Sequence, residues 1–433
     1  MSVRAPHRAR SIVAVSVAAT AALAISACGG SSSNSSGDKA AAATTASSST
    51  KTTAAQKPTG TPIKILVDSG VGSPLGSFPG VWATAQVAAD NINNAGGVNG
   101  QPIEIVQCNN RIEPNSAAKC GRQAVKEQVT AVTGQDVYTP AIYPALQKAG
   151  IPAMYMSITA PDIEVPISHP ISGGGAAELF GVPHAAAKAG AKSIAFLTIQ
   201  IPGFDVVQKN AIAEAEKIGL KVVKTIPVSP TSTSFAAPVQ QARSSGADAV
   251  ALLVAAPQIA GILQAAQQQG YKPKWAGDAG TFNTEQLQAA SKLAPDNLFL
   301  VSSMPPSGAG DQFDGIKRFN AQMDAAAAAG NKDAGASERY ENVVVTWATV
   351  YAIAEIGKSI KGEINAKSLT QALESPDTVA EVPGLLTFKP GAAGDAKYPA
   401  LKDNGPLYVG QVKDGQLQVD KQTVASTEGV TLQ

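Results

Sequence analysis

This sequence has almost no excess of positive or negative charge, and it has few histidines and cysteines. Each of these shortages excludes a class of function. The 433 residues include 34 lysines and arginines against 33 aspartates and glutamates, so the formal net charge is +1. We find no cluster of basic residues that would serve as a contact surface for phosphates. We therefore expect no nucleic-acid partner.

Catalytic and metal-binding patterns are also missing. Beyond the N-terminal segment only two histidines remain, His169 and His184, and each adjoins a proline. The sequence has no Gly-x-Ser-x-Gly elbow, no His-Glu-x-x-His pair, no Walker-type phosphate loop and no cysteine pair with metal-ligand spacing. The loop 68–76 nearly matches a dinucleotide fingerprint, but its third glycine falls one residue late and Pro74 interrupts it. We expect no catalytic residue, no metal and no cofactor.

The first residues have the pattern of a secretory signal peptide. Several basic residues precede an apolar run, Ser11 to Ala24, that is too short to span a membrane comfortably. The run is followed by Ile-Ser-Ala and Cys28, which resembles the lipobox of bacterial lipoproteins, in which the cysteine is diacylated. We predict a lipoprotein signal peptide over residues 1–28 with lipidation at Cys28. The alternative is a plain cleavage site with an incidental cysteine.

Residues 29–60 consist almost entirely of Ser, Thr, Ala, Gly and Lys. Such a composition cannot bury enough apolar surface to offset the entropy lost on ordering. We predict a disordered tether that holds a folded body near the outer face of the cell membrane. The protein is thus expected outside the cytoplasm and attached to the membrane through its N-terminal lipid only.

Two cysteines remain once Cys28 is lipidated. Cys108 ends a predicted strand and Cys120 lies in the following predicted helix, in a compartment that permits disulfides. We predict a disulfide between them, which would staple a local loop. Two free buried thiols are the alternative.

From residue 61 onward, short apolar runs typical of buried strands alternate with helical patterns, which favours an α/β fold with parallel sheets. In the first part we predict that Asn115 caps a helix, and we expect strands at 61–67, 103–106, 131–133 and 151–156. After a stretch rich in Pro, Ser and Gly we expect strands at 193–198, 220–226, 249–254, 273–276 and 298–301, and helices at 205–218, 235–244, 257–269 and 284–293. Two similar lobes are expected.

Three Pro- and Gly-rich stretches, near 169–180, 302–311 and 382–384, are predicted to cross between the lobes. The first lobe is expected to comprise residues 61–175 and 304–382, and the second residues 176–303 and 383–433 with the C-terminal tail. The returning segments are expected to hold helices at 312–329, 338–360 and 368–374, and a strand pair at 385–388 and 407–412 followed by an Asp414-Gly415 hairpin turn.

The segment 130–162 carries the densest set of candidate ligand groups. Thr139 and Pro140 fit the N-cap and first position of a helix, and the strand at 151–156 leads into polar residues. In an open parallel sheet, ligands bind beyond the carboxyl ends of strands, where helix N-termini present unpaired N–H groups. We predict half of a small-molecule site here.

Three motifs carry a resemblance to a known family. They are the decapeptide Asn91 to Gly100, NINNAGGVNG; Val132-Thr133-Gly134 with Gly150-Ile151-Pro152; and Ser234-Phe235 with Gly246 to Val250. With them the chain resembles, from Pro62 to about Gln418, the type I periplasmic binding proteins of the branched-chain amino-acid and amide family, which supply ABC transporters. The resemblance implies two Rossmann-like lobes, joined by three hinge crossings, that close on a solute without catalysis.

The resemblance also implies which residues bind the ligand. A loop beyond Gly134 supplies hydroxyls and amides to a ligand carboxylate in the family, and here it offers Tyr138 and Thr139. In the family, a strand end supplies backbone amides and a threonine hydroxyl, and it corresponds here to Ser157, Ile158 and Thr159. The loop and this strand end together form one predicted half-site.

The second half-site departs from the family. Ala255-Ala256 stands where amino-acid binders place a tyrosine, and the acid that binds the ligand ammonium is displaced by one residue to Asp278. A buried ammonium needs a carboxylate or several acceptors, so Asp278 is the candidate. The alternative is a solvated loop aspartate that caps the next helix.

Four aromatic residues fall near the predicted loops of the site, and ligand pockets of this kind are largely apolar. They are Phe78, Tyr138, Tyr155 and Phe204, with ordinary core packing as the alternative for each. Trp347, on a helical stripe, is expected in the core.

These features predict a monomeric solute-binding lipoprotein. It would capture a small polar solute by lobe closure and deliver it to an ABC transporter permease. A branched-chain or other amino acid, or a related carboxylate or amide, is the expected solute. A lipoprotein of the same fold that senses its ligand and signals to a partner without transport is the alternative.

Overall fold

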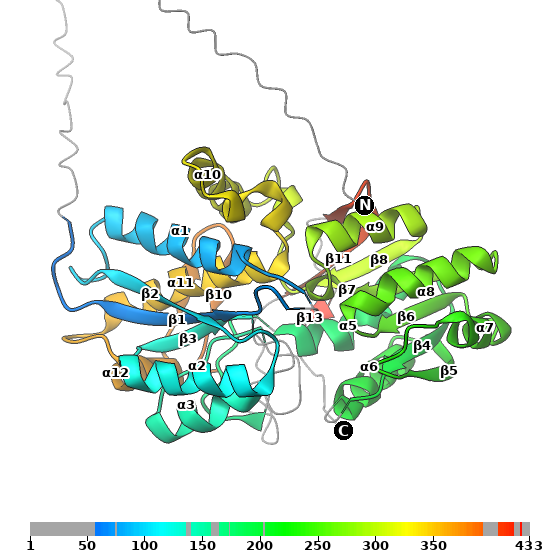
Figure 1. The fold of residues 1–433 in the computed structure, drawn as a ribbon, viewed down its shortest axis with the longest axis horizontal. Coiled ribbons are helices and arrows are strands. Elements are labelled where there is room, and N and C mark those ends of the chain that lie inside the picture. Colours follow the sequence, from blue (N-terminus) through cyan, green and yellow to red (C-terminus); the bar gives the residue numbers. More distant parts are fainter. Residues whose placement is uncertain are drawn as a thin grey trace, which may run out of the picture. The chain divides into compact units, whose positions relative to one another are not determined.

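The computed structural model describes residues 57–73, 76–135, 140–156, 164–172, 174–201, 204–392, 406–419 and 425–426. The chain from Ala54 to Gln433 forms one compact unit. Its strands fall mainly into two sheets, and we call each sheet with the helices packed on it a lobe (Figure 1).

The first lobe contains a parallel three-stranded sheet of order β2-β1-β3. Its strands are β1 (Ile63–Ser69), β2 (Ile103–Asn109) and β3 (Ala131–Gly134). Apolar side chains fill both faces of β1, as expected for a parallel sheet covered on both sides. Ile63, Ile65 and Val67 pack into the core of one face, whereas Leu66 packs into the core of the other.

Helices cover the two faces of this sheet. The face of Ile65 is covered by α1 (Gly80–Asn94) and α11 (Glu341–Ser359), on which α10 (Asp314–Ala328) packs in turn, and the face of Leu66 by α2 (Pro114–Glu127) and α3 (Tyr143–Ala149). Trp347 is fully buried in the first of these cores and lies edge-on to Phe319, which confirms its predicted place.

Two local predictions for this lobe are wrong. No regular strand forms at 151–156: Val132 pairs with Ala153 in an isolated parallel bridge only. Pro152 has no N–H to extend a ladder, and the backbone of Ala153 is also hydrogen-bonded to Ile167 and His169. Asn115 does not cap α2.

The α2 helix instead begins at Pro114, with Glu113 as the N-cap residue and no side-chain capping bond. Proline suits the first helical position because its fixed φ is helical and its missing N–H would have no partner there. The helix therefore starts one residue before the predicted cap.

The decapeptide at the end of α1 joins this helix to β2. The Asn93 side chain accepts a hydrogen bond from the Ile103 N–H (2.7 Å) and donates one to the Ile103 carbonyl (2.9 Å). Gly97 adopts a φ of 71°, and a Cβ there would lie 2.4 Å from the Gln101 carbonyl oxygen. The motif thus fixes how β2 leaves the end of α1.

The second lobe contains a larger sheet of order β12-β11-β8-β7-β6-β4-β5, with β13 (Ala425–Ser426) paired to β11. Its parallel strands are β4 (Ser193–Ile199), β5 (Lys221–Val228), β6 (Ala249–Leu253), β7 (Lys274–Asp278) and β8 (Leu298–Ser302). The strand β11 (Pro406–Lys413) runs antiparallel to β8 and to β12 (Gln416–Val419).

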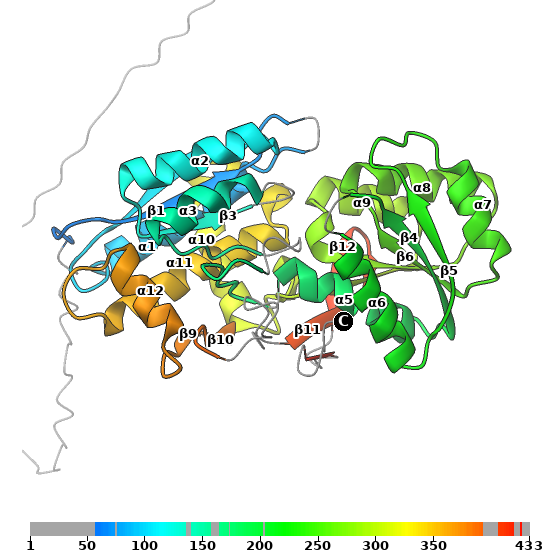
Figure 2. The same ribbon diagram turned by 90° about the horizontal axis from the view of Figure 1, so that it is seen from below.

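Helices cover both faces of this sheet too. Two helices that lie side by side cover one face, α5 (Gly174–Lys188) and α6 (Asp205–Lys217), as Figure 2 shows. Three cover the other, α7 (Ala236–Ser244), α8 (Ala256–Gln268) and α9 (Thr284–Leu293). The predicted alternation of strands and helices is confirmed, and α9 has its predicted bounds.

The predicted strand pair at the C-terminal end does not form. The short strand β10 (Leu386–Phe388) pairs with β9 (Ala380–Val382), which follows α12 (Ala366–Glu374), and packs in the same core as α11. The hairpin turn between β11 and β12 is confirmed: Asp414 and Gly415 have φ of 51° and 72°, which suits a tight hairpin.

Candidate solute-binding site

Polar side chains collect where β1 and β3 end in the first lobe. Asp68, near the end of β1, is fully buried, and its carboxylate accepts a hydrogen bond of 2.8 Å from the Asn110 side chain. Asn110 also donates to the Gln135 carbonyl at 2.9 Å. Burial raises the pKa of Asp68 to about 6, although the Asn110 bond lowers it. This network holds the strand ends in register.

The backbone at the end of β3 comes unusually close to β1. Gly134 has a φ of 125°, and a Cβ there would lie 2.1 Å from the Asp68 carbonyl oxygen. Only glycine fits this position, because the conformation and the space both exclude a side chain. The close spacing of the two strands therefore depends on Gly134.

Both predicted aromatic residues that the structure describes in the first lobe are buried. Phe78 lies edge-on to the Tyr340 ring, with centroids 5.7 Å apart, and its carbonyl accepts a hydrogen bond from the Ser69 hydroxyl. Tyr155 is buried beside Tyr143 in the core on the α2 and α3 face. Core packing accounts for both positions, and their ligand roles stay predictions.

In the second lobe, Phe204 is the N-cap residue of α6 and is buried in the core between this helix and the sheet. The structure thus gives it the packing role that was the alternative to ligand contact. A contact with solute remains a prediction for this residue.

Asp278 ends β7 at the carboxyl edge of the second sheet. Its carboxylate accepts hydrogen bonds from the Thr281 N–H (2.9 Å) and hydroxyl (2.7 Å), so it caps the short 3₁₀ helix η2 (Ala279–Thr281). The side chain is buried rather than solvated, and burial raises its pKa to about 6. Asp278 therefore combines the predicted cap with a desolvated carboxyl group.

Two further buried acids lie near Asp278, and the sequence analysis did not identify them. Glu178 lies on α5 and Glu341 is the first residue of α11; the charges of Glu341 and Asp278 both raise the pKa of Glu178, after the larger effect of burial. Gly280 separates the groups: a Cβ there would lie 3.2 Å from Glu178 Oε2 and 3.7 Å from Asp278 Oδ2. Three elements thus bring three carboxyl groups to one place.

A small cavity of about 60 Å³ adjoins this acidic group. It lies where β7 and β8 end and α11 begins, and its lining includes Ala279, Ser302, Tyr340 and Glu341. Among the described residues, no group of His, Cys, Asp and Glu has the arrangement of a metal site.

The other half of the predicted site lies outside the described residues. This applies to the predicted ligand groups Tyr138, Thr139, Ser157, Ile158 and Thr159. The predicted lipidation site, Cys28, also lies outside them. Within the described ranges, no helix has the length and apolar character needed to cross a membrane.

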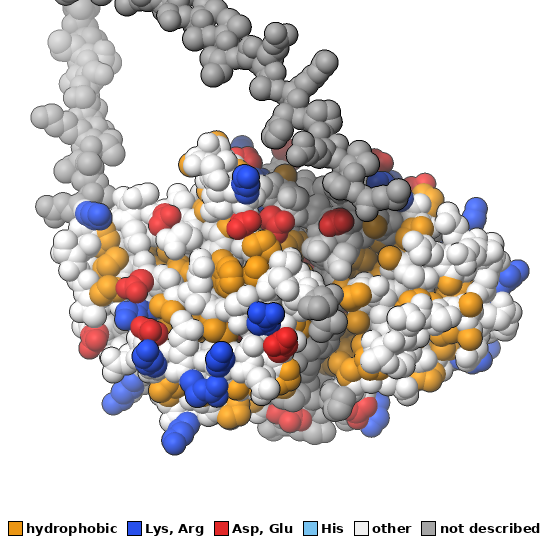
Figure 3. Space-filling model, viewed as in Figure 1, with side chains coloured by type: hydrophobic (Ala, Val, Ile, Leu, Met, Phe, Trp, Pro, Cys, Tyr) orange, Lys and Arg blue, Asp and Glu red, His pale blue; other side chains and the backbone are white. Residues whose placement is uncertain are grey.

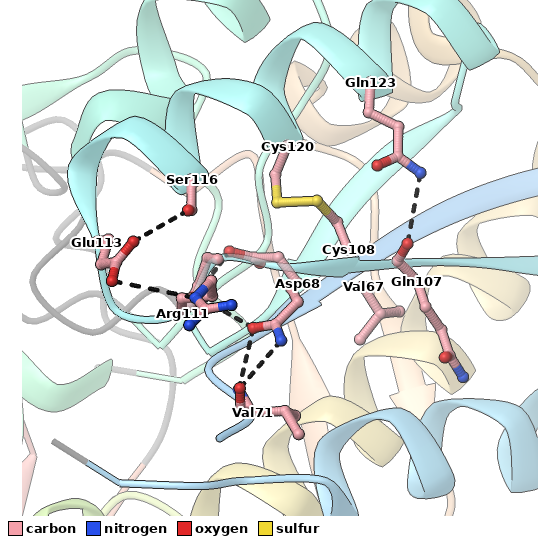
Figure 4. The surroundings of a disulfide bond; sticks show 12 residues. Val67, Asp68, Val71, Gln107, Cys108, Arg111, Glu113, Ser116, Cys120 and Gln123 are labelled. Carbon is pink, nitrogen blue, oxygen red and sulfur yellow. Dashed lines mark hydrogen bonds and ion pairs between the residues drawn. A yellow bond between two sulfur atoms is a disulfide. The ribbon is translucent and has the colours of Figure 1, made fainter. Parts of the chain in front are cut away.

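The predicted disulfide is present. Cys108, in β2, and Cys120, in α2, are bonded, with their Cα atoms 5.7 Å apart (Figure 4). At the last residue of β2, the Asn109 side chain accepts a hydrogen bond from the Val71 N–H and donates one to the Val71 carbonyl. The disulfide fastens the end of β2, an edge strand, to the helix α2 that follows it.

The surface carries charges of both signs. Figure 3 shows acidic and basic side chains interspersed with apolar ones on one face of the molecule. This mixture agrees with the net charge of +1.

The fold is that of solved bacterial solute-binding proteins. The structure superimposes on a solute-binding protein from Rhodopseudomonas palustris in complex with 4-hydroxybenzoate (TM-score 0.66, 18% identity, 84% of this chain and 96% of that one). It also superimposes on a fatty acid ABC transporter substrate-binding protein from Thermomonospora curvata (TM-score 0.67, 16% identity, 86% and 94%). A third is LivJ from Streptococcus pneumoniae in complex with isoleucine (TM-score 0.64, 21% identity, 84% and 99%).

Two parallel-sheet lobes with polar groups at their strand ends define the class as a type I periplasmic binding fold. A family model described as "Periplasmic binding protein" matches residues 63–416, and the chain belongs to this family. No curated protein matches the chain in sequence.

Membership in the family confirms several predictions. The protein is a solute-binding protein and not an enzyme, its ligand is a small molecule, and its place is outside the cytoplasm. The family also implies an ABC transporter as partner.

Proposed function

We propose that the protein is a lipid-anchored, monomeric solute-binding protein that captures a small zwitterionic solute, an amino acid, and delivers it to an ABC transporter permease. The observation that carries the choice of solute is the buried carboxyl group of Asp278 at the end of β7. An acid desolvated at the carboxyl edge of a parallel sheet suits a ligand ammonium, which would stabilise its charged form.

Recognition of the solute carboxylate falls to the first lobe in this proposal. Tyr138, Thr139 and Thr159 would supply hydroxyls, and Ser157 and Ile158 backbone amides, on the basis of the family resemblance alone. Charge-assisted hydrogen bonds contribute about 1.5–3 kcal/mol each, so two or three would provide much of a micromolar affinity.

Closure follows from the division of the ligand groups between lobes. A solute that contacts both lobes stabilises the closed form by its differential affinity for the two states. Docking on the permease would then be reserved for the closed, loaded protein.

Isothermal titration of single variants tests this proposal. Thr159→Val should weaken the binding of an amino acid and of its deaminated acid alike, by about tenfold or more for one lost charge-assisted bond. Asp278→Asn should weaken the amino acid only. Equal affinities of wild type and Thr159→Val would remove the first-lobe assignment, and an unchanged amino-acid affinity in Asp278→Asn would remove the ammonium site.

A further inference from the structure

Two carboxyl groups from different lobes meet at one backbone N–H of a hinge crossing. Ser303 directly follows β8, where the chain returns towards the first lobe. Its N–H lies 2.8 Å from Glu178 Oε1, on α5 of the second lobe, and 2.7 Å from Glu341 Oε1, on α11 of the first. The crossing is thus held from both sides.

The crossing makes further bonds to the same group. Glu341 Oε1 also accepts from the Ser303 hydroxyl (3.0 Å) and from the Met304 N–H (3.1 Å). The Ser172 hydroxyl, on the stretch that leads into α5, donates to the Ser303 hydroxyl at 3.1 Å. One cluster therefore connects two of the crossings.

No described basic side chain neutralises these two acids. Asp278, the titratable group that faces them from β7, is itself acidic. On the approach to α11, Glu338 is acidic, and the guanidinium of Arg339 is bonded to Asp324 (2.6 Å) and Asn320.

On α5, the nearest basic group is the ring of His184, which is bonded to Glu214 (2.9 Å). Glu178 and Glu341 are both more than nine-tenths buried, and in each the second oxygen, Oε2, accepts no hydrogen bond from a described N–H or O–H group. Two ionised carboxylates in this position would repel each other, and only the hydrogen bonds from Ser303 and Met304 would offset this repulsion.

We propose that Glu178 and Glu341 share one proton at neutral pH, and that this proton-bridged pair is a latch which holds the second crossing between α5 and α11. Glu178 is the donor of a hydrogen bond to Glu341 in the bridged state. When the proton leaves for solvent, two carboxylates remain on one N–H and the latch loosens. The hinge is therefore stiffer at low pH than at high pH, whatever solute the protein binds.

The direction of the pH dependence of the hinge follows from burial and charge. Burial and the neighbouring carboxylates raise the pKa of Glu178 well above its usual range, so the pair keeps its proton at pH values at which an ordinary glutamate is ionised and loses it as the pH rises further. Hydrogen exchange at the Ser303 and Met304 amides reports this loss. After correction for intrinsic base catalysis, exchange should accelerate by up to about tenfold per pH unit over the interval in which the latched pair still holds the proton and the opened hinge does not, and should level off once the pair ionises.

Infrared spectroscopy tests the proton directly in the whole protein. At about pH 8, carboxyl groups with a pKa of about 6, such as Asp68 and Asp278, are ionised, so a protonated carboxyl band reports a more strongly shifted group. We expect this band in the wild type and its loss in Glu178→Gln. Glutamine can still accept from Ser303 and donate to Glu341, so it imitates the protonated state.

The Glu178→Gln variant also tests whether ionisation of the pair loosens the hinge crossing. Glu178→Gln should make the corrected amide exchange at Ser303 independent of pH, because its latch cannot ionise. Glu355→Gln is the matched control on α11: Glu355 bonds Lys358 at 2.6 Å, and its removal should leave the band and the exchange profile as in the wild type.

Each result decides the proposal. A wild type without a protonated carboxyl band at about pH 8 overturns it, even if no variant folds. A band that persists in Glu178→Gln places the proton elsewhere and also overturns it. A band lost in Glu178→Gln together with unchanged pH-dependent exchange would contradict the latch.

Discussion

Glu178 and Glu341 accept hydrogen bonds from the same N–H, that of Ser303, although they lie 125 and 38 residues from it along the chain. One acid belongs to a helix of the second lobe and the other to a helix of the first. The contact places an ionisable group at a point where the chain passes between lobes. In the proposed latch, protonation and hinge mechanics are linked at this point.

Buried carboxyl groups should give the protein an unusual dependence of stability on pH. The folded protein keeps the Asp68 proton up to its raised pKa of about 6, whereas the unfolded chain releases it near the ordinary pKa of 3.8. The folded state binds more protons over this interval, so the free energy of unfolding falls as pH rises through it. For Asp68 alone the fall is about 3 kcal/mol.

Urea unfolding between about pH 4 and 7 in wild type and Asp68→Asn measures this effect. The variant should lose the part of the slope that belongs to Asp68, because asparagine does not titrate. Asp296→Asn is the control, since Asp296 is exposed and its left-handed backbone also suits asparagine. Parallel pH profiles for wild type and Asp68→Asn would contradict the assignment.

Gly134→Ala should destabilise the first lobe strongly. The new methyl group would lie against the Asp68 carbonyl at a φ that L-residues avoid, so we expect a loss of about 2–4 kcal/mol in chemical unfolding. Gly150→Ala isolates the backbone contribution, because Gly150 has a φ of 65° and no atom within 4 Å of the added Cβ. Equal losses in the two variants would show that the close approach of β3 to β1 is unimportant.

Removal of the disulfide should lower stability without changing solute binding. The bond closes a segment with a sequence separation of 12, for which chain entropy predicts about 3 kcal/mol. The double variant Cys108→Ser and Cys120→Ser should reproduce the effect of reductant on the wild type in urea unfolding. A large change in solute affinity would mean that the bond shapes the site itself.

Much of the fold follows from sequence because its signals are local. Apolar runs separated by capped helices predicted the strands of the second sheet, and α9 has a capping box at Asn283 that marks its start. The strand expected at 151–156 fails because an apolar run does not reveal which backbone groups will pair. The backbone of Ala153 is hydrogen-bonded on its other side to residues 167 and 169. This pairing depends on how distant segments pack and not on the local sequence.

The acidic cluster could not be predicted in full from local sequence patterns. Asp278 was identified through the family resemblance, as the displaced acid, but Glu178 stands inside an apolar helix and Glu341 opens another. A single acid within an apolar stretch was the available signal for Glu178, whereas Glu341 lies in a polar run before an apolar helix and carries no such signal. Their meeting at Ser303 depends on how two distant segments return to the crossing, which no local pattern encodes.

The most direct test of the proposed function is thermal unfolding of the protein with leucine, isoleucine and valine, each compared with its deaminated acid and its amide. A ligand at a hundred times its dissociation constant adds about 2.7 kcal/mol, which raises Tm by about 2 °C or more in a chain of this size. The account predicts such a rise with an amino acid and, at the same concentration, a much smaller one with the matching deaminated acid. A rise with the deaminated acid alone, or with none of these compounds, would contradict it.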